Sequence, residues 1–464
     1  MKDNCNKVLN KNIEIIIFGA TGDLAHKKLF PSISNLFKDF KYKDKFNILA
    51  LGRNEETTSD FTQRFNDTID KENREQFYSK IEYFVCDFLK KEDLEKLKIR
   101  LDKTCSSKIL YLAIPPSLYE AVILNIEEVG LNKPCSNHNN FIRIVLEKPF
   151  GENLKTSKSL NKTLLSGFSE NQIFRIDHYL GKEPIQNIFS FRFANNIFEN
   201  LWNNNYIDNI QIKVSEDIGI ETRGFFYEQT GALVDVFQNH ILQMLSVLTM
   251  DTPYLFEEKY VRKEKNNILK KLTFSDVIKG QYIGYKEENN VSPDSLTETY
   301  IALKLEIKNS RWRNVPIYIE TGKFLKEKKT EISVVFKKGN NNLFKKNGHN
   351  VLKFLIQPAL GIGLTMLAKI PSIYDYEVSN INMLYNFSDY FGEVKSEYEK
   401  LLIDCIEGNQ INFTRSDEIE SSWILVDKIK TDIKNKKPIL YKKGSLGPTE
   451  RDMFLKKDNR YWIS

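Results

Sequence analysis

IEIIIFGATGDLA, residues 13–25, decides the fold of this chain. The run from Ile13 to Phe18 is almost continuously apolar, which is typical of a strand buried on both faces of a parallel sheet. Gly19, Gly22 and Ala25 follow with the spacing G-x-x-G-x-x-A. Glycines at a strand-to-helix turn let backbone amides approach a pyrophosphate at the positive end of the helix. The stretch therefore indicates a dinucleotide-binding turn, although a strand, turn and helix without a ligand would also fit.

Strands and helices alternate outward from this turn. A helix is expected at 28–40, and further apolar strands are expected at 46–51, 109–114 and 142–146. This alternation predicts an α/β Rossmann-like dinucleotide-binding domain with a doubly wound sheet. We assign residues 1–176 to it.

From residue 177 onward the pattern changes to segments with one solvated face. Alternating strands are expected at 210–214, 300–307, 315–319, 332–336 and 351–356. Several of them follow one another without helical spacers, which favours a mainly antiparallel sheet. Long helices are expected at 233–250 and 389–407, and a surface loop at 339–350. Residues 177–464 are therefore assigned to a larger α+β domain with a mainly antiparallel sheet.

The composition describes a folded, soluble protein without a nucleic-acid or membrane partner. Of the 464 residues, 41% are hydrophobic and 12% aromatic, which is enough for a large core. Lys and Arg outnumber Asp and Glu by 68 to 62, and the excess of +6 is scattered, so no nucleic-acid partner is expected. No segment approaches the ~18 apolar residues of a membrane span, and the N-terminus has no signal core.

The cysteines give an expectation about the compartment. There are five, without any C-x-x-C spacing: Cys5, Cys86, Cys105, Cys135 and Cys405. An odd and sparse set favours reduced thiols and a cytoplasmic location over a disulfide framework or a zinc site. No metal site is expected.

The end of the second strand carries the residues expected to choose the cofactor. Asp or Glu there would read the ribose 2′-hydroxyl of NAD, but the chain has Arg53 after Gly52. A guanidinium pairs with a phosphate through two hydrogen bonds, which favours the 2′-phosphate of NADP. An ordinary surface arginine is the alternative interpretation of Arg53, and Glu55 and Glu56 keep the use of NAD open.

The segment RIDHYLGKE, residues 175–183, carries the densest set of reactive side chains. It places Asp177 and His178 beside a phenol and an ammonium group, in a chain that has only five histidines. A second imidazole, His240, ends the motif DVFQNH inside the helix expected at 233–250. The pattern alone leaves His240 open as a core histidine or as a catalytic base, a role that suits an imidazole because its pKa is near neutral.

These motifs together resemble those of the glucose-6-phosphate dehydrogenase family. GATGDLA, EKPFG, RIDHYLGKE, DVFQNH and the Gly-Lys of ETGKFL occur in the family's order. The similarity continues through GKEPIQNIFSFRFAN, LWNNNYIDNIQI and the C-terminal GSLGPTE, and so covers nearly the whole chain. The resemblance implies oxidation of glucose 6-phosphate at C1 to 6-phosphogluconolactone with hydride transfer to NADP, the first step of the oxidative pentose phosphate pathway.

The resemblance also implies roles for individual residues. His240 is the expected base for the O1 proton, and Asp177 is expected to hold the other ring nitrogen. Substrate contacts are expected from Lys148, His178, Tyr179, Lys182, Glu216, Asp235, Lys323, Lys328 and Gln357, of which His178, Tyr179 and Lys182 would hold the phosphate. Cofactor contacts are expected from Gly19, Ala20, Thr21, Gly22, Asp23, Leu24, Arg53, Tyr119 and Lys148.

The chain departs from the family pattern at Phe225, Val234, Glu320 and Leu360. Glu320 stands where the family often has arginine, so it is expected to weaken the local positive potential. The resemblance further implies a homodimer or homotetramer formed through the large sheet. Two other functions stay open: a dehydrogenase of another hexose phosphate or of a free sugar, and a non-catalytic binding protein. The presence of both Asp177 and His240 argues against the second.

Overall fold

The computed structural model describes residues 12–39, 41–43, 45–134, 140–339, 348–371, 377–392 and 394–463. The chain forms two compact units, which are described separately below. The first unit contains Met1–Gly181, Glu257–Arg262 and Lys395–Ile419, and the second contains Lys182–Phe256, Lys263–Val394 and Glu420–Ser464. Two segments from the second half of the sequence thus complete the first unit.

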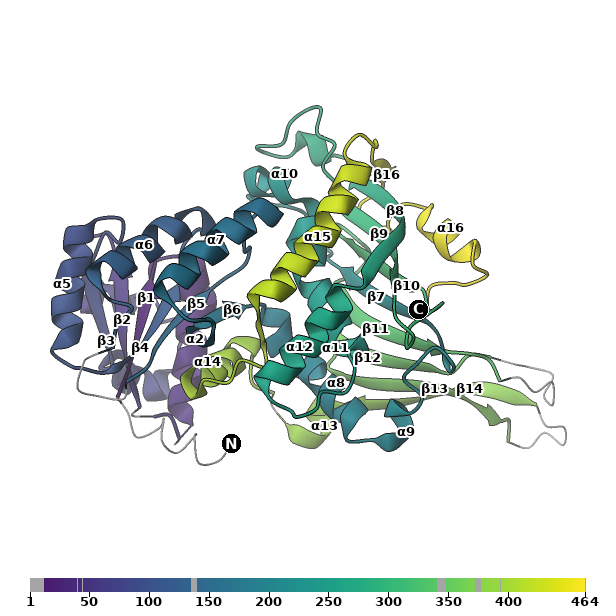
Figure 1. Ribbon diagram of the computed structural model, residues 1–464, viewed down its shortest axis with the longest axis horizontal. Helices are drawn as coiled ribbons and strands as arrows, with labels where there is room; N and C mark the ends of the chain where they lie inside the picture. Colours follow the sequence, from purple (N-terminus) through teal and green to yellow (C-terminus); the bar gives the residue numbers. More distant parts are fainter. Residues whose placement is uncertain are drawn as a thin grey trace. The chain divides into compact units, whose positions relative to one another are not determined.

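A seven-stranded sheet forms the centre of the first unit (Figure 1). Its order is β15-β6-β5-β4-β1-β2-β3. The strands are β1 (Ile13–Phe18), β2 (Phe46–Gly52), β3 (Ile81–Val85), β4 (Ser107–Leu112), β5 (Ile142–Leu146), β6 (Ile173–Ile176) and β15 (Phe413–Thr414). Neighbouring strands pair in parallel except for β15, which is antiparallel to β6. The predicted Rossmann-like parallel sheet is confirmed.

Helices of the first unit pack on this sheet. They are η1 (Ala25–Leu29), α2 (Phe30–Lys38), α3 (Thr58–Gln63), η2 (Lys71–Asn73), α4 (Arg74–Tyr78), α5 (Lys91–Asp102), η3 (Pro116–Leu118), α6 (Tyr119–Val129), α7 (Leu154–Gly167), η4 (Glu170–Gln172), η5 (His178–Gly181) and α14 (Glu397–Glu407). Ile13, Ile15 and Ile17 of β1 are fully buried in one core with the apolar faces of α2 and α14. Ile16 and Phe18, on the other face of the strand, are fully buried as well, and this burial on both faces explains the continuous apolar run of β1.

A nine-stranded sheet organises the second unit (Figure 1), in the order β14-β13-β12-β11-β7-β10-β9-β8-β16. The strands are β7 (Ile207–Ser215), β8 (Leu272–Tyr282), β9 (Tyr300–Ile307), β10 (Ile317–Gly322), β11 (Lys329–Phe336), β12 (Val351–Gln357), β13 (Gly361–Lys369), β14 (Val378–Asn386) and β16 (Ile439–Tyr441). Pairing is antiparallel apart from β10 with β7 and β16 with β8. The predicted mainly antiparallel sheet is confirmed.

The second unit also contains the helices α8 (Glu183–Phe193), α9 (Asn196–Glu199), α10 (Gly224–Ala232), η6 (Leu233–Ile241), α11 (Leu242–Thr249), η7 (Tyr285–Glu287), α13 (Phe387–Phe391) and α16 (Arg451–Lys456). Two further helices, α12 (Glu258–Leu269) and α15 (Ser416–Ile433), have residues in both units. Among the residues that the structure describes, every helix is too short or too polar to cross a membrane.

Two of the expectations are wrong, and a third concerns residues that the structure mostly does not describe. The single helix expected at 389–407 is wrong: α13 ends at Phe391 because Gly392 takes a positive φ of 68°, and α14 starts only at Glu397, where Ser396 caps it. Cys86 and Cys405 are free thiols, but Cys105 is disulfide-bonded, against the expectation of reduced cysteines. Most of the loop expected at 339–350 lies outside the described residues.

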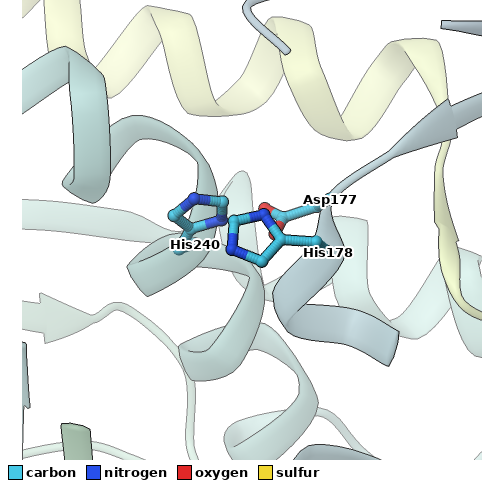
Figure 2. A group of neighbouring side chains, drawn as sticks. All are labelled: Asp177, His178 and His240. Carbon is cyan, nitrogen blue, oxygen red and sulfur yellow. The ribbon is translucent and has the colours of Figure 1, made fainter. Parts of the chain in front are cut away.

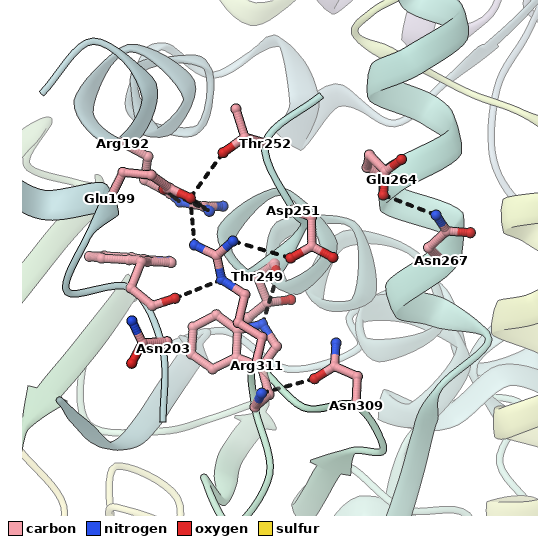
Figure 3. A network of polar contacts seen from close by, with 12 residues as sticks. Arg192, Glu199, Asn203, Thr249, Asp251, Thr252, Glu264, Asn267, Asn309 and Arg311 are labelled. Carbon is pink, nitrogen blue, oxygen red and sulfur yellow. Dashed lines mark hydrogen bonds and ion pairs between the residues drawn. The ribbon is translucent and has the colours of Figure 1, made fainter. Parts of the chain in front are cut away.

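A buried polar network holds the C-terminal end of α11, the helix that directly continues η6 (Figure 3). Arg192 of α8 is fully buried and donates to Glu199 at 3.0 to 3.2 Å. The same carboxylate pairs with Arg311, whose Nη1 also reaches Asp251 at 3.1 Å. Burial lowers the pKa of Arg192 to about 10. The network joins α8 and α9 to the segment that follows α11, and so anchors that end of the helix.

Candidate active site

The glycine turn after β1 has the geometry of a phosphate cradle. Gly19 has a φ of +78°, and a Cβ there would lie 2.6 Å from the carbonyl oxygen of Ala113. Gly22 donates its N–H to the Gly19 carbonyl at 3.0 Å, which closes the turn ahead of η1. Only glycine satisfies both the positive φ and the close backbone approach at position 19.

A pocket of about 260 Å³ opens at this turn, inside the first unit. It lies at the carboxyl ends of β1, β2 and β4, where open parallel sheets bind their ligands. Arg53 is exposed on its wall, directly after Gly52. The lining residues are Gly19, Thr21, Gly22, Gly52, Arg53, Asp87, Phe88, Leu89, Ala113, Ile114, Pro115 and Leu118. The pocket combines glycine backbone, which a pyrophosphate can approach closely, with the guanidinium of Arg53. These groups fit a phosphorylated dinucleotide.

The other predicted cofactor residues surround this turn in different ways. Ala20 is buried and donates its N–H to the Leu51 carbonyl at 3.0 Å, which ties the turn to β2. Asp23 is exposed and pairs with Lys27 at 2.8 Å. Leu24 is partly buried against the core of the unit. These three positions shape the turn, whereas Thr21 lines the pocket directly.

Tyr119 positions the end of β5, where Lys148 follows the strand. Its hydroxyl donates to the Glu147 carbonyl at 2.9 Å and accepts from the Glu147 N–H at 3.2 Å. The Glu147 side chain accepts from the Tyr111 hydroxyl at 2.6 Å and from Tyr398. Burial raises the pKa of Glu147 to about 7, against these two hydrogen bonds, which lower it. Tyr119 therefore acts on Lys148 through the backbone of its neighbour.

Asp177 and His178 directly follow β6, at the carboxyl ends of the parallel strands. Figure 2 shows their side chains. Asp177 is buried, and its Oδ1 accepts the Tyr179 N–H at 3.0 Å, which starts the short helix η5. The His178 ring stacks on Tyr398 with centroids 6.4 Å apart and an interplanar angle of 11°. Lys182, the first residue of the second unit, is the N-cap residue of α8.

His240 lies in η6, which is a π-helix and not the ordinary α-helix expected there (Figure 2). A π-helix closes its hydrogen bonds over five residues, so residues five apart share a face. Asp235 and His240 have that spacing. Asn239 stabilises the widened turn: its amide donates to the carbonyls of Val234 and Asp235 at 3.1 and 3.2 Å. His240 is buried, with its N–H donating to Asn239 Oδ1 at 2.6 Å.

Three predicted substrate residues meet inside the second unit. Lys323 pairs with Glu216 at 2.5 Å and lies 3.9 Å from Asp235. Glu216 follows β7 and Lys323 follows β10, two parallel neighbours whose last residues, Ser215 and Gly322, are register partners. The ammonium is buried and also stands 5.2 Å from the centre of the Tyr227 ring. A cation held by two carboxylates leaves acceptor oxygens able to bind hydroxyl groups.

Lys328 and Gln357 belong to the same edge of this sheet by register. Lys328 immediately precedes β11, whose Lys329 pairs with Ser215 of β7. Gln357 ends β12 and pairs with Thr330. Lys328 is exposed and Gln357 is half-buried. The sheet topology brings both to the edge that carries Glu216 and Lys323.

Several residues of this site were not predicted from the sequence. Tyr111, Tyr398 and Tyr227 support Glu147, His178 and Lys323 from distant parts of the chain, and a single sequence carries no signal for such pairings. Glu320 was noted as a departure, and its carboxylate is bound by Arg451 at 2.7 and 2.8 Å and by the Tyr300 hydroxyl at 3.0 Å. Arg451 thus balances the charge of Glu320.

Comparison with known proteins gives a consistent result for the whole chain. A family model described as "Glucose-6-phosphate dehydrogenase, NAD binding domain" matches residues 16–187, and "Glucose-6-phosphate dehydrogenase, C-terminal domain" matches residues 189–463. Glucose-6-phosphate 1-dehydrogenase of Borreliella burgdorferi is 40% identical, covering 97% of this chain and 98% of the relative. The Bacillus subtilis enzyme of the same name is 37% identical, with 97% of each chain covered. A solved structure of glucose-6-phosphate dehydrogenase in complex with its substrate glucose-6-phosphate has a TM-score of 0.91 and 31% identity, covering 98% of this chain and 99% of that one.

Proposed function

The chain belongs to the glucose-6-phosphate dehydrogenase family, and we propose how its residues carry out that reaction with NADP as the cofactor. The protein is an oxidoreductase that acts on a CH–OH group, glucose-6-phosphate 1-dehydrogenase, which opens the oxidative pentose phosphate pathway. The division into a cofactor domain, 1–176, and a substrate domain, 177–464, and the cytoplasmic location are part of the same proposal.

The pocket at the glycine turn supports NADP. The Gly19 backbone and the N–H groups at the start of η1 bind a pyrophosphate, and Arg53 pairs with the 2′-phosphate. Lys27 is exposed near the turn, although it pairs with Asp23. Bound NADP⁺ supplies the acceptor for the hydride. Lys148, held at the end of β5 by Tyr119 and Glu147, contacts both the cofactor and the sugar.

The substrate is held by groups of complementary chemistry. His178, Tyr179 and Lys182 donate to the phosphate. Glu216 and Asp235 accept hydrogen bonds from sugar hydroxyls, and Lys323 holds these two carboxylates in place. Lys328 and Gln357 add contacts from the neighbouring strands. Because Lys323 is buried between two acids, the cluster carries one net negative charge and prefers neutral hydroxyls to a phosphate.

His240 is the base of the reaction. Its ring accepts the O1 proton while hydride leaves C1, so that the hemiacetal becomes a lactone and one proton and one hydride are lost. Asp177 accepts from the other ring nitrogen, which selects the tautomer and stabilises the imidazolium. The π-helical turn keeps His240 on the face of η6 that also presents Asp235 to the sugar.

One observation carries the substrate assignment: Glu216, Asp235 and Lys323 meet at a sheet edge although more than a hundred residues separate the first from the last. The test is the initial rate with glucose 6-phosphate, measured separately with NADP and with NAD. We expect a higher kcat/KM with NADP. Glucose and galactose 6-phosphate serve as comparison substrates, and equal rates for all three would contradict the phosphate role of His178 and Lys182 and favour a broader sugar dehydrogenase.

The second unit also has a surface that suits self-association. The outer strand β14 exposes Met383 (54%) and Leu384 (59%), and the following helix α13 exposes Tyr390 and Phe391, each at 70%. Apolar side chains gathered at a sheet edge are costly in water and are usually covered by a partner. We propose that a second copy covers them in a homodimer or homotetramer. Light scattering of the wild type and of Leu384→Asp tests this, with a smaller mass expected for the variant.

A further inference from the structure

Glu298 lies in the segment that leads into β9 and contacts the start of η6. It is buried, with only 7% of its surface exposed. Its carboxylate Oε1 accepts the Leu233 N–H at 3.2 Å, and its backbone carbonyl accepts the Ala232 N–H at 3.0 Å. The Leu233 N–H also donates to the Thr230 carbonyl, so Glu298 Oε1 is a second acceptor for it. With both its carboxylate and its carbonyl bound to amides at this point, Glu298 caps η6 from a distant segment.

The backbone of η6 starts at a kink that is fitted to this carboxylate. Gly231, the last but one residue of α10, has φ 59° and ψ −177°, and this break in the helical backbone lies two residues before η6 begins. A Cβ at Gly231 would lie 2.3 Å from Glu298 Oε1. The glycine therefore serves two needs at once: it permits the positive φ and leaves room for the carboxylate against the helix end.

The residue after Glu298 contacts the other half of the substrate cluster. The Thr299 carbonyl accepts the Lys323 N–H at 2.9 Å, and the Lys323 carbonyl accepts the Tyr441 hydroxyl at 2.7 Å. The dipeptide Glu298–Thr299 thus links the start of η6 to the strand end that carries Lys323. Asp235 lies in the first turn of η6, 3.9 Å from Lys323.

We propose that Glu298 is a positioning residue for the reaction: its carboxylate and carbonyl hold the N-terminus of η6, and this sets Asp235 against Lys323 and keeps His240 one π-turn further on the same face. The inference rests on the proposed function, since it concerns the geometry of the same site. Glu298 acts through η6 and not by direct contact with the sugar or the cofactor. We therefore expect a change at Glu298 to alter the kinetics with glucose 6-phosphate and to leave the KM for NADP unchanged, because the cofactor pocket belongs to the first unit.

The test compares two substitutions of Glu298 in the full-length enzyme. Glu298→Asp withdraws the carboxylate from the Leu233 N–H, whereas Glu298→Gln keeps an acceptor oxygen at the original reach. We expect Glu298→Asp to lower kcat/KM for glucose 6-phosphate at least tenfold while the KM for NADP stays within twofold. Glu298→Gln should stay within threefold of the wild type on both measures.

Glu228 offers a matched control because it lines the same pocket of about 400 Å³ as Glu298. Its carboxylate accepts from the hydroxyls of Tyr285 and Ser295 at 2.7 and 2.6 Å and from the Ser292 N–H at 3.3 Å, so these hydrogen bonds lead away from η6. Glu228→Asp should lower the Tm but leave kcat/KM within threefold. Equal kcat/KM for the two Asp variants, or a Glu298→Gln variant as impaired as Glu298→Asp, would overturn the positioning role.

A second measurement separates this inference from the proposed function. Hydrogen exchange of the amides in Leu233–Ile241 should speed up at least tenfold in Glu298→Asp and stay near the wild-type rate in Glu298→Gln and Glu228→Asp. A wild type without turnover of glucose 6-phosphate would contradict the function and not the capping role. Unchanged exchange in Glu298→Asp would contradict the capping role even if the enzyme is active.

Discussion

Glu216 and Lys323 form an ion pair at 2.5 Å because they are the next residues after two register partners, Ser215 and Gly322, on parallel strands. The pairing is thus a direct product of sheet register, and a slip of either strand would separate the two side chains. It also explains how a buried ammonium is tolerated, since Asp235 contributes a second carboxylate at 3.9 Å.

Removing the ammonium from this cluster should weaken sugar binding. Lys323→Gln leaves Glu216 and Asp235 without a counter-charge, so their positions and their hydrogen bonds to hydroxyls are lost. We expect the KM for glucose 6-phosphate to rise at least tenfold, with the KM for NADP unchanged. The exposed Lys326→Gln is the control. Parallel increases in both Michaelis constants would show that Lys323 has only a general structural role.

Replacing the base should stop turnover without abolishing binding. General base catalysis contributes about 10²- to 10⁴-fold. We therefore expect His240→Asn to lower kcat by about three orders of magnitude, while calorimetry still detects glucose 6-phosphate. His349→Asn, a histidine whose Nδ1 contacts the Phe336 carbonyl, is expected to be fully active. A rate near that of the wild type for His240→Asn would reject the assignment.

The choice of cofactor should depend on Arg53. Arg53→Ala removes the cation that pairs with the 2′-phosphate, so the KM for NADP should rise at least tenfold and the KM for NAD by less than twofold. Arg64→Ala is a control in the same unit, since Arg64 pairs with Glu56 at 2.6 Å. If both cofactors lose affinity equally, Arg53 does not read the 2′-phosphate.

Glu147 should give the stability of the protein a distinctive pH dependence. Burial raises the pKa of Glu147 from 4.5 to about 7, so the folded protein holds this proton more tightly than the unfolded chain. Stability from this group is therefore greatest below pH 4.5 and falls as the pH rises towards 7, by about 3 kcal/mol in total.

Glu147→Gln removes this dependence, because an amide has no proton to lose and still accepts from Tyr111. As the pH rises from 5 to 8, the free energy of unfolding of the wild type should fall relative to that of the variant. Chemical denaturation at both pH values measures the difference, with the exposed Glu95→Gln as a control. A constant difference across this range would mean that Glu147 does not titrate there.

The network of Figure 3 should contribute to stability and not to chemistry. Glu199→Gln leaves the fully buried Arg192 without a carboxylate, a loss expected to cost about 3 to 5 kcal/mol. Asp251→Asn, on the exposed side of the network, should cost less than about 1 kcal/mol. Denaturant titration measures both values. An equal, small cost for the two variants would show that Arg192 finds another partner.

The spacing of apolar residues along the sequence predicted most of the strands and helices. The features that it did not predict depend on backbone conformation or on contacts between distant segments. The apolar run before Gly19 identified β1 because burial on both faces leaves a direct mark on the sequence. The helix expected at 389–407 failed because its apolar periodicity continues across Gly392, whose positive φ ends α13. The π-turn of η6 left no periodic signal that distinguishes it from an α-helix.

The site divides in the same way. Motifs and resemblance named Glu216, Asp235 and Lys323, which the second unit brings together. The supports of these residues, such as Tyr227 and Glu298, could not be predicted, because each pairing depends on the register of strands and loops far apart in the chain.

The widened turn of η6 makes the site sensitive to how tightly this segment is wound. Each residue of an ordinary α-helix turns the following side chains by about 100°. If η6 rewound into a regular α-helix with every residue kept, Asp235 and His240, which are five positions apart, would lie about 140° apart around the axis. The chain could then lose the shared face of its acid and its imidazole without any change in composition.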